Sequence, residues 1–416
     1  MERALLVTVV RAGREAWTEQ ESALELWDLA SSCGLEPIGQ LTARVQRPNS
    51  KYFIGSGKAE EIAASAAAAK AGVVVFGWDL SGAQQRNLEE VIGRKTINRT
   101  QLILDVFARR ARSLEGKLQV ELAQLNYLLP RLAGKGIYLS QQAGGIGTRG
   151  PGETKLEMDR RRIRDRIRHL AGEVKKVGGQ RERHRAKRAE SGVPTAALVG
   201  YTNAGKSTLF NALTGAGVRQ EERMFTTLDP TVRKVVLPGG QNILLVDTVG
   251  FLHLLPHDLI DAFKATLEEV SEADVLIHVL DAAKPNARKL EASVLGVLEE
   301  LRLGDRKRIT ALNKTDNFPD AETRARVAAF WPDGVLISAK RGDGLEALLA
   351  RVADALKDRV EEAEFLLPYR SKWVSRIHDH AEVLEQDNRA EGVYFRVRLN
   401  RLTAASLKKR IGAESL

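Results

Sequence analysis

The chain has 416 residues, of which 43% are hydrophobic and 28% charged, and its formal net charge is +10. A chain of this length is expected to form about two to four domains. Its apolar runs fall far short of the ~20 residues that a membrane span requires. Cys33 is the single cysteine, which excludes an intrachain disulfide and a cysteine-based zinc site. A strand-like segment almost directly after Met1 leaves no room for a signal or transit peptide, so we expect a cytoplasmic protein.

The positive charge is concentrated in one part of the chain. Residues 99–190 hold 22 Lys and Arg against 10 Asp and Glu, so this segment carries +12 and the remainder carries −2. A charge excess confined to one region is typical of a protein that binds a polyanion such as RNA. A solvated basic helix surface without a partner is the alternative.

Residues 1–98 alternate strand-like and helix-like segments. Strands are expected over Leu5–Val10, Ile38–Val45 and Val73–Phe76, and helices over Glu21–Ser32, Lys58–Lys70 and Ser81–Ile92. Ser81 is a plausible N-cap. This order predicts a small α/β domain with a partly parallel sheet.

Residues 99–190 predict an antiparallel helical hairpin. A long helix is expected from Thr100 to Leu132 and a second over Leu156–Val177. Each carries apolar residues at alternating steps of four and three, the pattern of a coiled-coil seam. These are Leu118, Leu122, Leu125 and Leu129 on the first helix, and Ile163, Ile167, Leu170, Val174 and Val177 on the second. Outside the second seam lie Arg160, Arg161, Arg162, Arg164, Arg166 and Arg168.

A glycine-rich connection, Gly134–Thr154, joins the two predicted helices. Gly145, Gly147 and Gly150 match the spacing of a dinucleotide fingerprint, but no strand leads into them, so we reject that interpretation. A connection of this length is either disordered or functional. At the tip of a basic hairpin it is suited to probing RNA, with Gly144, Gly145, Gly147 and Arg149 as candidate contacts together with Arg160, Arg161, Arg162 and Arg164. Gly178–Pro194 is expected to be a polar, basic connector.

A complete phosphate-loop motif follows the connector. Gly200, Gly205, Lys206 and Ser207 occupy the fixed positions of G-x-x-x-x-G-K-[ST], after an apolar strand and before a helix. Backbone N–H groups of such a loop surround a polyphosphate, the lysine reaches the β- and γ-phosphates, and the serine hydroxyl ligates Mg²⁺. The expected contacts are Gly200, Tyr201, Thr202, Asn203, Ala204, Gly205, Lys206, Ser207 and Thr208.

Two downstream motifs are expected to sense the γ-phosphate. Phe225, Thr226 and Thr227 lie where a mobile switch loop belongs; Thr227 is preferred as the ligand of Mg²⁺ and the γ-phosphate, and Thr226 is the alternative. Asp247 ends an apolar strand and would hold Mg²⁺, while the N–H of Gly250 would bind the γ-phosphate. Loss of that phosphate releases both loops. The second motif contributes Asp247, Thr248, Val249 and Gly250.

Two further motifs select guanine. A carboxylate at Asp316 can accept hydrogen bonds from guanine N1–H and the 2-amino group, which adenine cannot offer. A backbone N–H of the second loop can reach guanine O6. The expected contacts are Asn313, Lys314, Asp316, Ser338, Ala339 and Lys340.

Phe251 stands where many small GTPases have the glutamine that orients the attacking water. A phenyl ring cannot do so, and slow hydrolysis that depends on a partner is therefore expected. The candidate catalytic residues are Lys206, Thr227 and Gly250, and the candidate Mg²⁺ ligands are Ser207, Thr227 and Asp247. Asn203 is a hypothetical K⁺ ligand.

The strands and helices around these motifs predict an open sheet with helices on both faces. Strands are expected over Ile243–Val246, Val275–Leu280, Ile309–Leu312 and Val335–Ile337, and helices over Asp258–Val270, Arg288–Leu301 and Leu345–Leu356. Two more strands are expected over Glu382–Glu385 and Val393–Leu399. The chain is thus of the α/β class, with four expected parts: an N-terminal α/β subdomain (1–98), a basic helical hairpin with a glycine-rich tip loop (99–190), a Ras-like P-loop GTPase domain (191–360) and a small C-terminal α+β domain (361–416).

The glycine-rich segment Gly144–Thr154, the phosphate loop, Thr227-Leu228-Asp229-Pro230 and Asp247–Phe251 together resemble the HflX family of translational GTPases. The resemblance covers nearly the whole chain. It implies binding of GTP and GDP, Mg²⁺ as cofactor, and binding to rRNA in the large (50S) ribosomal subunit and the 70S ribosome. It also implies dissociation of stalled or idle ribosomes, often under stress, with a hairpin tip near the peptidyl-transferase region and hydrolysis stimulated by the ribosome. Lys155 departs from the polar uncharged residue of many relatives.

Two other functions remain open. The first is an RNA-modifying or RNA-remodelling enzyme in which GTP gates a catalytic site in residues 1–98, although that region shows no nucleophile with a base. The second is an RNA-binding assembly factor without turnover, which Lys206, Ser207 and Asp247 disfavour. We expect a monomer.

Overall fold

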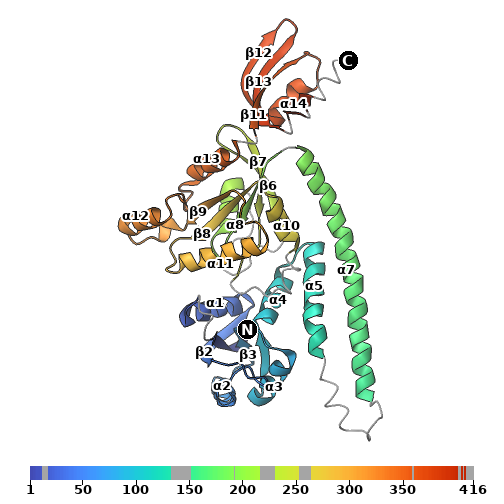
Figure 1. Cartoon of the computed structure of the whole chain (residues 1–416), viewed down its shortest axis with the longest axis vertical. Coiled ribbons are helices and arrows are strands. Elements are labelled where there is room, and N and C mark those ends of the chain that lie inside the picture. The colour runs from blue at the N-terminus through green and yellow to red at the C-terminus, as the bar shows by residue number, and fades with distance from the viewer. Residues whose placement is uncertain are drawn as a thin grey trace. The chain divides into compact units, whose positions relative to one another are not determined.

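The computed structural model (Figure 1) describes residues 1–11, 17–132, 151–191, 193–215, 230–252, 264–357, 360–401, 404–405 and 407–408. The chain divides into two compact units, with Met1–Val177 forming most of the first and the residues from Gly178 onward most of the second. No helix in the described ranges is long and apolar enough to cross a membrane.

The first unit contains a four-stranded sheet with the order β2-β1-β3-β4, and every pairing in it is parallel. The sheet is therefore wholly parallel rather than partly so, and its fourth strand was missed because it is short and begins with polar residues. The strands are β1 (Glu2–Arg11), β2 (Leu35–Val45), β3 (Val73–Phe76) and β4 (Lys95–Asn98).

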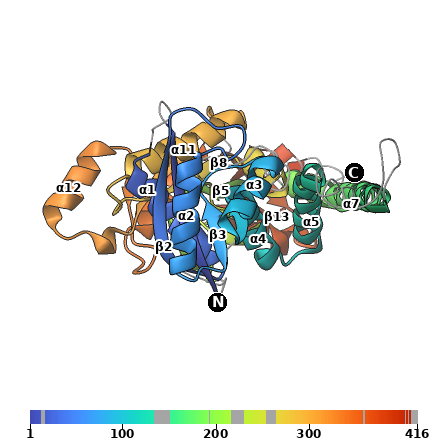
Figure 2. The same cartoon turned by 90° about the horizontal axis from the view of Figure 1, so that it is seen from below.

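Helices cover both faces of this sheet (Figures 1 and 2). They are α1 (Glu19–Ser32), α2 (Ser56–Ala68), α3 (Gly82–Ile92) and α4 (Arg99–Arg110). α2 and α3 share a core with alternate residues of β1, such as Leu5 and Val7, whereas α1 packs with α4. Ser81 caps α3 as predicted, and it forms a reciprocal capping box with Gln84.

The predicted single helix from Thr100 to Leu132 is wrong. The chain instead forms α4, then α5 (Leu114–Leu128), and then the 3-10 turn η1 (Leu129–Leu132). Ala111 is extended, and the hydroxyl of Ser113 accepts the N–H of Gly116 at 2.9 Å, which starts a new helix. Leu118 is buried, but Val120, Ala123 and Tyr127 are buried in place of the rest of the expected seam.

The second hairpin helix, α7, spans Pro151–Ser191 and is 41 residues long. The predicted helix end at Val177 is wrong, because the helix continues to Ser191, through most of the predicted basic connector Gly178–Pro194. Its polar sequence is rich in strong helix formers. The predicted apolar stripe is present: Leu170 is buried, and Ile163, Ile167, Val174 and Val177 are half-buried. Of the predicted tip, Pro151 to Thr154 are helical, and residues 134–150 lie outside the described residues.

The second unit contains a six-stranded sheet with the order β10-β9-β8-β5-β7-β6, parallel except for the antiparallel edge strand β6. The sequence did not predict β6, because its outward residues are charged or exposed. The strands are β5 (Thr195–Val199), β6 (Thr231–Val236), β7 (Asn242–Asp247), β8 (Val275–Asp281), β9 (Arg308–Asn313) and β10 (Val335–Leu336).

Helices pack on both faces of this sheet, as expected from the sequence. The described helices are α8 (Lys206–Thr214), α10 (Lys264–Glu272), α11 (Ala287–Glu300), the turn η3 (Thr315–Asn317), α12 (Ala321–Phe330) and α13 (Leu345–Ala355). α8 and α13 share one core with Val275, Ile277 and Val279 of β8. Alternate residues of β8 point to the other face, where α11 contacts the strand.

The C-terminal part forms an antiparallel three-stranded sheet with the order β11-β13-β12. It consists of β11 (Val360–Leu367), α14 (Trp373–His380), β12 (Glu382–Arg389) and β13 (Gly392–Asn400). Its core is built on Phe365, Phe395 and Trp373. The two predicted strands are present and longer than expected, whereas β11 and α14 were not predicted.

His278 lies in the middle of β8, in register with Val199 of β5 and Thr310 of β9, and its side chain is fully buried. Within the described residues neither ring nitrogen has a hydrogen-bond partner. Burial, together with the positive charges of Arg308 and Lys206, lowers the pKa of His278 to about 3. The ring is therefore neutral in the fold and takes up a proton on unfolding below its ordinary pKa.

We expect the buried, neutral His278 to make strand β8 less stable at acidic pH. Because the unfolded state binds the extra proton below pH ~6.5, stability should fall by about 2 kcal/mol between pH 7 and pH 5 from this residue alone. His278→Leu should remove that part of the pH dependence, measured as opening free energies of β8 amides by hydrogen exchange. His169→Leu, at an exposed position of α7, is the control. Equal pH slopes in His278→Leu and wild type would contradict the prediction.

Candidate nucleotide-binding site

The phosphate-loop motif lies between β5 and α8, at the carboxyl ends of the parallel strands, where open α/β sheets bind ligands. The loop covers residues 200–205, and α8 begins at Lys206. Gly205 has a φ of +97°, and a Cβ atom there would lie 2.3 Å from Nδ2 of Asn313. Only glycine can therefore occupy this position without displacing the side-chain amide of Asn313.

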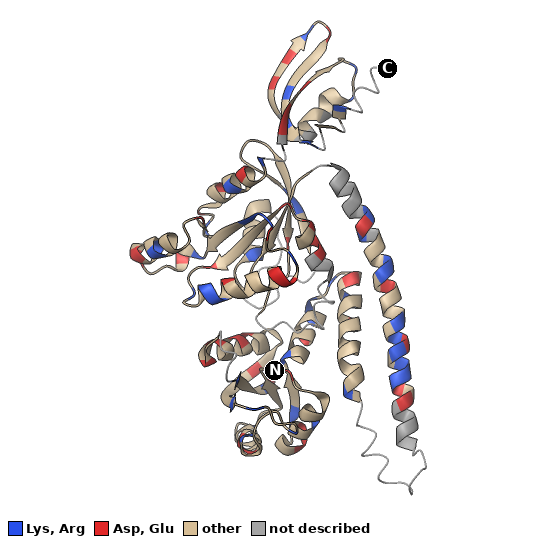
Figure 3. Ribbon diagram, viewed as in Figure 1, with Lys and Arg blue, Asp and Glu red and all other residues tan. Residues whose placement is uncertain are grey.

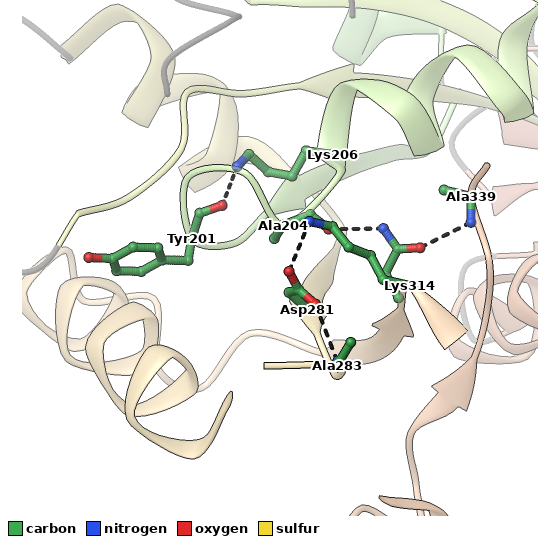
Figure 4. Close-up of polar contacts among 8 residues, drawn as sticks. Tyr201, Ala204, Lys206, Asp281, Ala283, Lys314 and Ala339 are labelled. Carbon is green, nitrogen blue, oxygen red and sulfur yellow. Dashed lines mark hydrogen bonds and ion pairs between the residues drawn. The ribbon is translucent and has the colours of Figure 1, made fainter. Parts of the chain in front are cut away.

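Lys206 is buried, and its Nζ donates a hydrogen bond to the carbonyl oxygen of Tyr201 at 2.9 Å (Figure 4). It also donates to the carbonyl oxygen of Gly200 at 3.1 Å. Burial lowers the pKa of this ammonium from 10.5 to about 8, and the carboxylate of Asp247 opposes the shift. A nearby anion strongly stabilises the charged form of a lysine that burial has destabilised. A polyphosphate in the loop would supply that anion.

The segment after β7 lies directly against the phosphate loop. The N–H of Phe251 donates to the carbonyl of Gly200 at 3.0 Å, and the N–H of Thr202 donates to the carbonyl of Phe251 at 2.9 Å. A Cβ atom on Gly250 would lie 2.8 Å from Cα of Thr202, so this approach requires glycine. The ring of Phe251 is only 3% exposed, which is consistent with the expectation that it does not orient an attacking water.

The oxygen donors near the loop suit Mg²⁺. Ser207 and Asp247 are both buried, with Asp247 at the end of β7 and Ser207 in the first turn of α8. Mg²⁺ prefers oxygen ligands and is held by one or two protein groups together with phosphate oxygens. The described residues contain no cluster of three or more His, Cys, Asp or Glu, so a metal here would depend on such phosphate ligands. The candidate switch residues Phe225, Thr226 and Thr227 lie outside the described residues.

Asn313 connects the phosphate loop to the 338–340 loop. Its Nδ2 donates to the carbonyl of Ala204 at 2.9 Å, and its Oδ1 accepts the N–H of Ala339 at 3.0 Å (Figure 4). The hydroxyl of Ser338 donates to Oδ1 of Asp316 at 2.6 Å, and this bond is the main reason that the pKa of Asp316 lies below its usual value. Asp316 is therefore an ionised acceptor, as recognition of the guanine N1–H and 2-amino group requires.

Asp281 is a residue of this site that the sequence analysis missed. At the end of β8 it is buried, and its Oδ2 lies 2.8 Å from Nζ of Lys314 (Figure 4). Its Oδ1 accepts the N–H of Ala283 at 3.2 Å. Lys314 itself has a φ of +65°, an uncommon conformation for a residue with a side chain. The sequence signal for Asp281 was its position at the end of the apolar strand β8. The carboxyl ends of neighbouring parallel strands lie at one edge of the sheet, so a polar residue there is close to the other site residues.

Four of the candidate RNA-binding arginines, Arg160, Arg161, Arg162 and Arg164, lie on α7, a helix rich in Lys and Arg (Figure 3). Arg161, Arg162 and Arg164 are exposed, and Arg160 is half-buried. Arg166 has a different role, because its Nε and Nη2 donate to the two carboxylate oxygens of Glu121 on α5 at 2.8 and 3.0 Å. The candidate tip residues Gly144, Gly145, Gly147 and Arg149 lie outside the described residues.

We expect Asp281→Asn to weaken guanine-nucleotide binding. Loss of the charge-assisted contact frees the Lys314 side chain from its position beside the loop, and such contacts contribute about 1.5–3 kcal/mol. GDP should dissociate about tenfold faster or more, measured by stopped-flow fluorescence with a labelled nucleotide. Asp305→Asn, at an exposed position before β9, is the matched control. Equal dissociation rates for wild type and Asp281→Asn would contradict the proposed role.

Sequence models of three protein families match the chain. They are described as GTP-binding GTPase N-terminal (residues 20–108), GTP-binding GTPase Middle Region (110–188) and 50S ribosome-binding GTPase (195–314). Among solved structures, a GTP-binding protein from Sulfolobus solfataricus in complex with GDP is similar, at 24% identity with a TM-score of 0.44, over 86% of this chain and 99% of that one.

Two curated relatives are more similar in sequence. GTPase HflX of Caldanaerobacter subterraneus subsp. tengcongensis is 44% identical over 397 residues, which are 94% of this chain and 90% of that protein. GTPase HflX of Escherichia coli is 45% identical over 351 residues, 84% of this chain and 82% of that protein. With this identity over most of both chains, and with the phosphate loop and its partner motifs assembled at one sheet edge, the protein belongs to the HflX family and is a GTPase.

Proposed function

We propose that this GTPase is a nucleotide-dependent switch that binds the large ribosomal subunit and the 70S ribosome and dissociates stalled or idle ribosomes, including under stress. The observation that carries the proposal is the continuity of the basic helix α7 with the GTPase domain. α7 ends at Ser191, and β5, which leads into the phosphate loop, begins at Thr195. The family match for residues 195–314, described as a 50S ribosome-binding GTPase, supports the same partner.

The exposed cations of α7 form the proposed rRNA surface, with Arg160 at its edge. They include Arg161, Arg162 and Arg164, and the exposed Lys175 and Lys176 extend the row. At 1.5 Å per residue, positions 161 to 176 span about 22 Å, which is long enough to contact several successive phosphates. Contacts of this kind set position and affinity rather than base specificity. Gly144, Gly145, Gly147 and Arg149 would add contacts from the tip.

In the proposed cycle, Lys206 would bind the β- and γ-phosphates, and Ser207, Thr227 and Asp247 would hold Mg²⁺. Bound Mg²⁺ neutralises the charge that develops on the phosphates during hydrolysis. The N–H groups of Thr227 and Gly250 sense the γ-phosphate, and its loss releases both segments. Because Phe251 is buried and cannot position the attacking water, GTP turnover would be slow in the free protein. The ribosome would then either supply a group that positions this water or order the residues of the site.

The test is GTP turnover by the full chain alone, with 50S subunits and with 70S ribosomes, together with light scattering to follow 70S dissociation. We expect slow basal turnover that rises at least tenfold with ribosomes. Deletion of Gly144–Gly150 should lower the stimulation and leave basal turnover unchanged, because the deleted residues are not part of the nucleotide site. Absence of stimulation by either particle would overturn the proposal. Stimulation by ribosome precursors alone would favour the assembly-factor alternative.

We also propose that Asn203 ligates K⁺. It lies exposed in the phosphate loop with a φ of +61°, a left-handed conformation that asparagine tolerates better than most residues. A cation there would stabilise negative charge on the transferring phosphate. GTP turnover should be several-fold faster in K⁺ than in Na⁺ at equal ionic strength, and Asn203→Ala should abolish the difference. Equal rates of GTP turnover in K⁺ and in Na⁺ would contradict the proposal that Asn203 ligates K⁺.

A further inference from the structure

The apolar stripe of α7 continues into a charged residue. Ile163, Ile167, Leu170, Val174 and Val177 follow one another at alternating steps of four and three, and the next position in that alternation is Arg181. Residues at this spacing lie on the same side of a helix. Arg181 therefore occupies a seam position, and its side chain is only 17% exposed.

Arg181 is bonded to the helix that follows the second switch motif. Its Nη2 donates to Oε2 of Glu268 on α10 at 2.8 Å, and the Glu268 side chain is 31% exposed. Both residues belong to the second unit. α10 is the first described helix after Asp247-Thr248-Val249-Gly250, the motif whose N–H groups face the γ-phosphate in the proposed cycle.

The far end of α10 is fixed to the strand that leads into the phosphate loop. Asp274, just after α10, accepts the N–H of Thr195 with Oδ2 at 2.8 Å and donates its own N–H to the carbonyl of Thr195 at 2.8 Å. Arg306 donates to the carbonyl of Ser271 at 2.7 Å. The contact of Arg181 with Glu268 is thus a second attachment, which joins α10 to α7.

The contact of Arg181 with Glu268 lies just after two glycines in α7. Gly178 and Gly179 lie just before Arg181, at the boundary between the two units. A Cβ atom on either glycine would meet nothing within 4 Å, and neither residue has a positive φ, so neither packing nor backbone geometry requires glycine here. Two glycines weaken a helix at this point. The segment after them is therefore stabilised by tertiary contacts such as that of Arg181.

We propose that Arg181 is a positioning residue for GTP hydrolysis, which clamps α10 to α7 and so transmits a load on the basic helix to the segment that carries Gly250. A charged residue at a seam position requires a specific partner, whereas an apolar residue would accept many. Glu268 supplies that partner and fixes which side of α10 faces α7. The inference rests on the proposed function, since the ribosome is the source of the load.

The test uses Arg181→Glu, Glu268→Arg and the charge swap that combines them. Stimulation, measured as turnover with 70S ribosomes divided by turnover alone, should fall at least fivefold in each single variant and recover to at least half in the swap. Cosedimentation with ribosomes should be retained in all three. Arg183→Glu is the matched control, because Arg183 is exposed and, among the described residues, donates to the carbonyl of Gly179 in its own helix. It should keep full stimulation.

Full stimulation in both single variants, or a swap that restores nothing, would overturn the clamp. If ribosomes do not stimulate the wild type, the proposed function fails, and hydrogen exchange tests the clamp without them. In that case α10 amides should exchange at least fivefold faster in Arg181→Glu than in wild type or Arg183→Glu. Equal exchange in all three proteins would overturn the inference.

Discussion

The nucleotide site depends on one side chain, that of Asn313. Its amide donates to the phosphate loop at Ala204, and its carbonyl accepts from the 338–340 loop at Ala339, so one residue at the end of β9 holds two loops that are far apart in sequence. The same amide occupies the space next to Gly205 and thereby excludes any side chain there. A buried amide with two such bonds is costly to replace, because substitution leaves backbone groups unsatisfied. The position of the phosphate loop relative to the 338–340 loop is set by this bond pair.

Around that bond pair, the site concentrates buried charge. Lys206, Asp247 and Asp281 are all buried at the carboxyl edge of the sheet, and the partly buried Lys314 lies against Asp281. Desolvation makes isolated charges expensive, and the chain offsets part of this cost by placing opposite signs close together. The lowered pKa of Lys206 shows that the offset is incomplete. A bound polyphosphate with a metal ion would complete this charge compensation. The nucleotide-bound site would therefore be favoured over the empty one.

α7 has two kinds of neighbour along its length. In the first unit, Arg166 is held by Glu121 of α5, and in the second, Arg181 is held by Glu268 of α10. Between them lie four of the five stripe residues, of which Leu170 is fully buried, and then the two glycines. The exposed arginines occupy other sides of the same helix. The exposed basic side chains and the contact with α10 therefore belong to one helix, α7.

Local patterns determined much of this protein. The phosphate loop, the guanine motifs, the capping role of Ser81 and the stripe of α7 were readable from the sequence, because residue spacing and caps act within a few residues of each other. The sequence did not predict the strands β4, β6 and β11, because edge strands and short strands gain their stability from pairing with distant segments. Helix α7 continues past Val177 in spite of its polar sequence, and no local apolar pattern marked that continuation.

The tertiary structure alone decided which distant residues meet. Asp281 contacts Lys314, and Arg181 contacts Glu268 across 87 positions of sequence. Spacing along the chain carries no information about such pairs, because the sheet order and the packing of α10 bring them together. The sequence by itself thus determined the chemistry that the protein can perform, and the fold decided how that chemistry is held in place and connected to the rest of the chain.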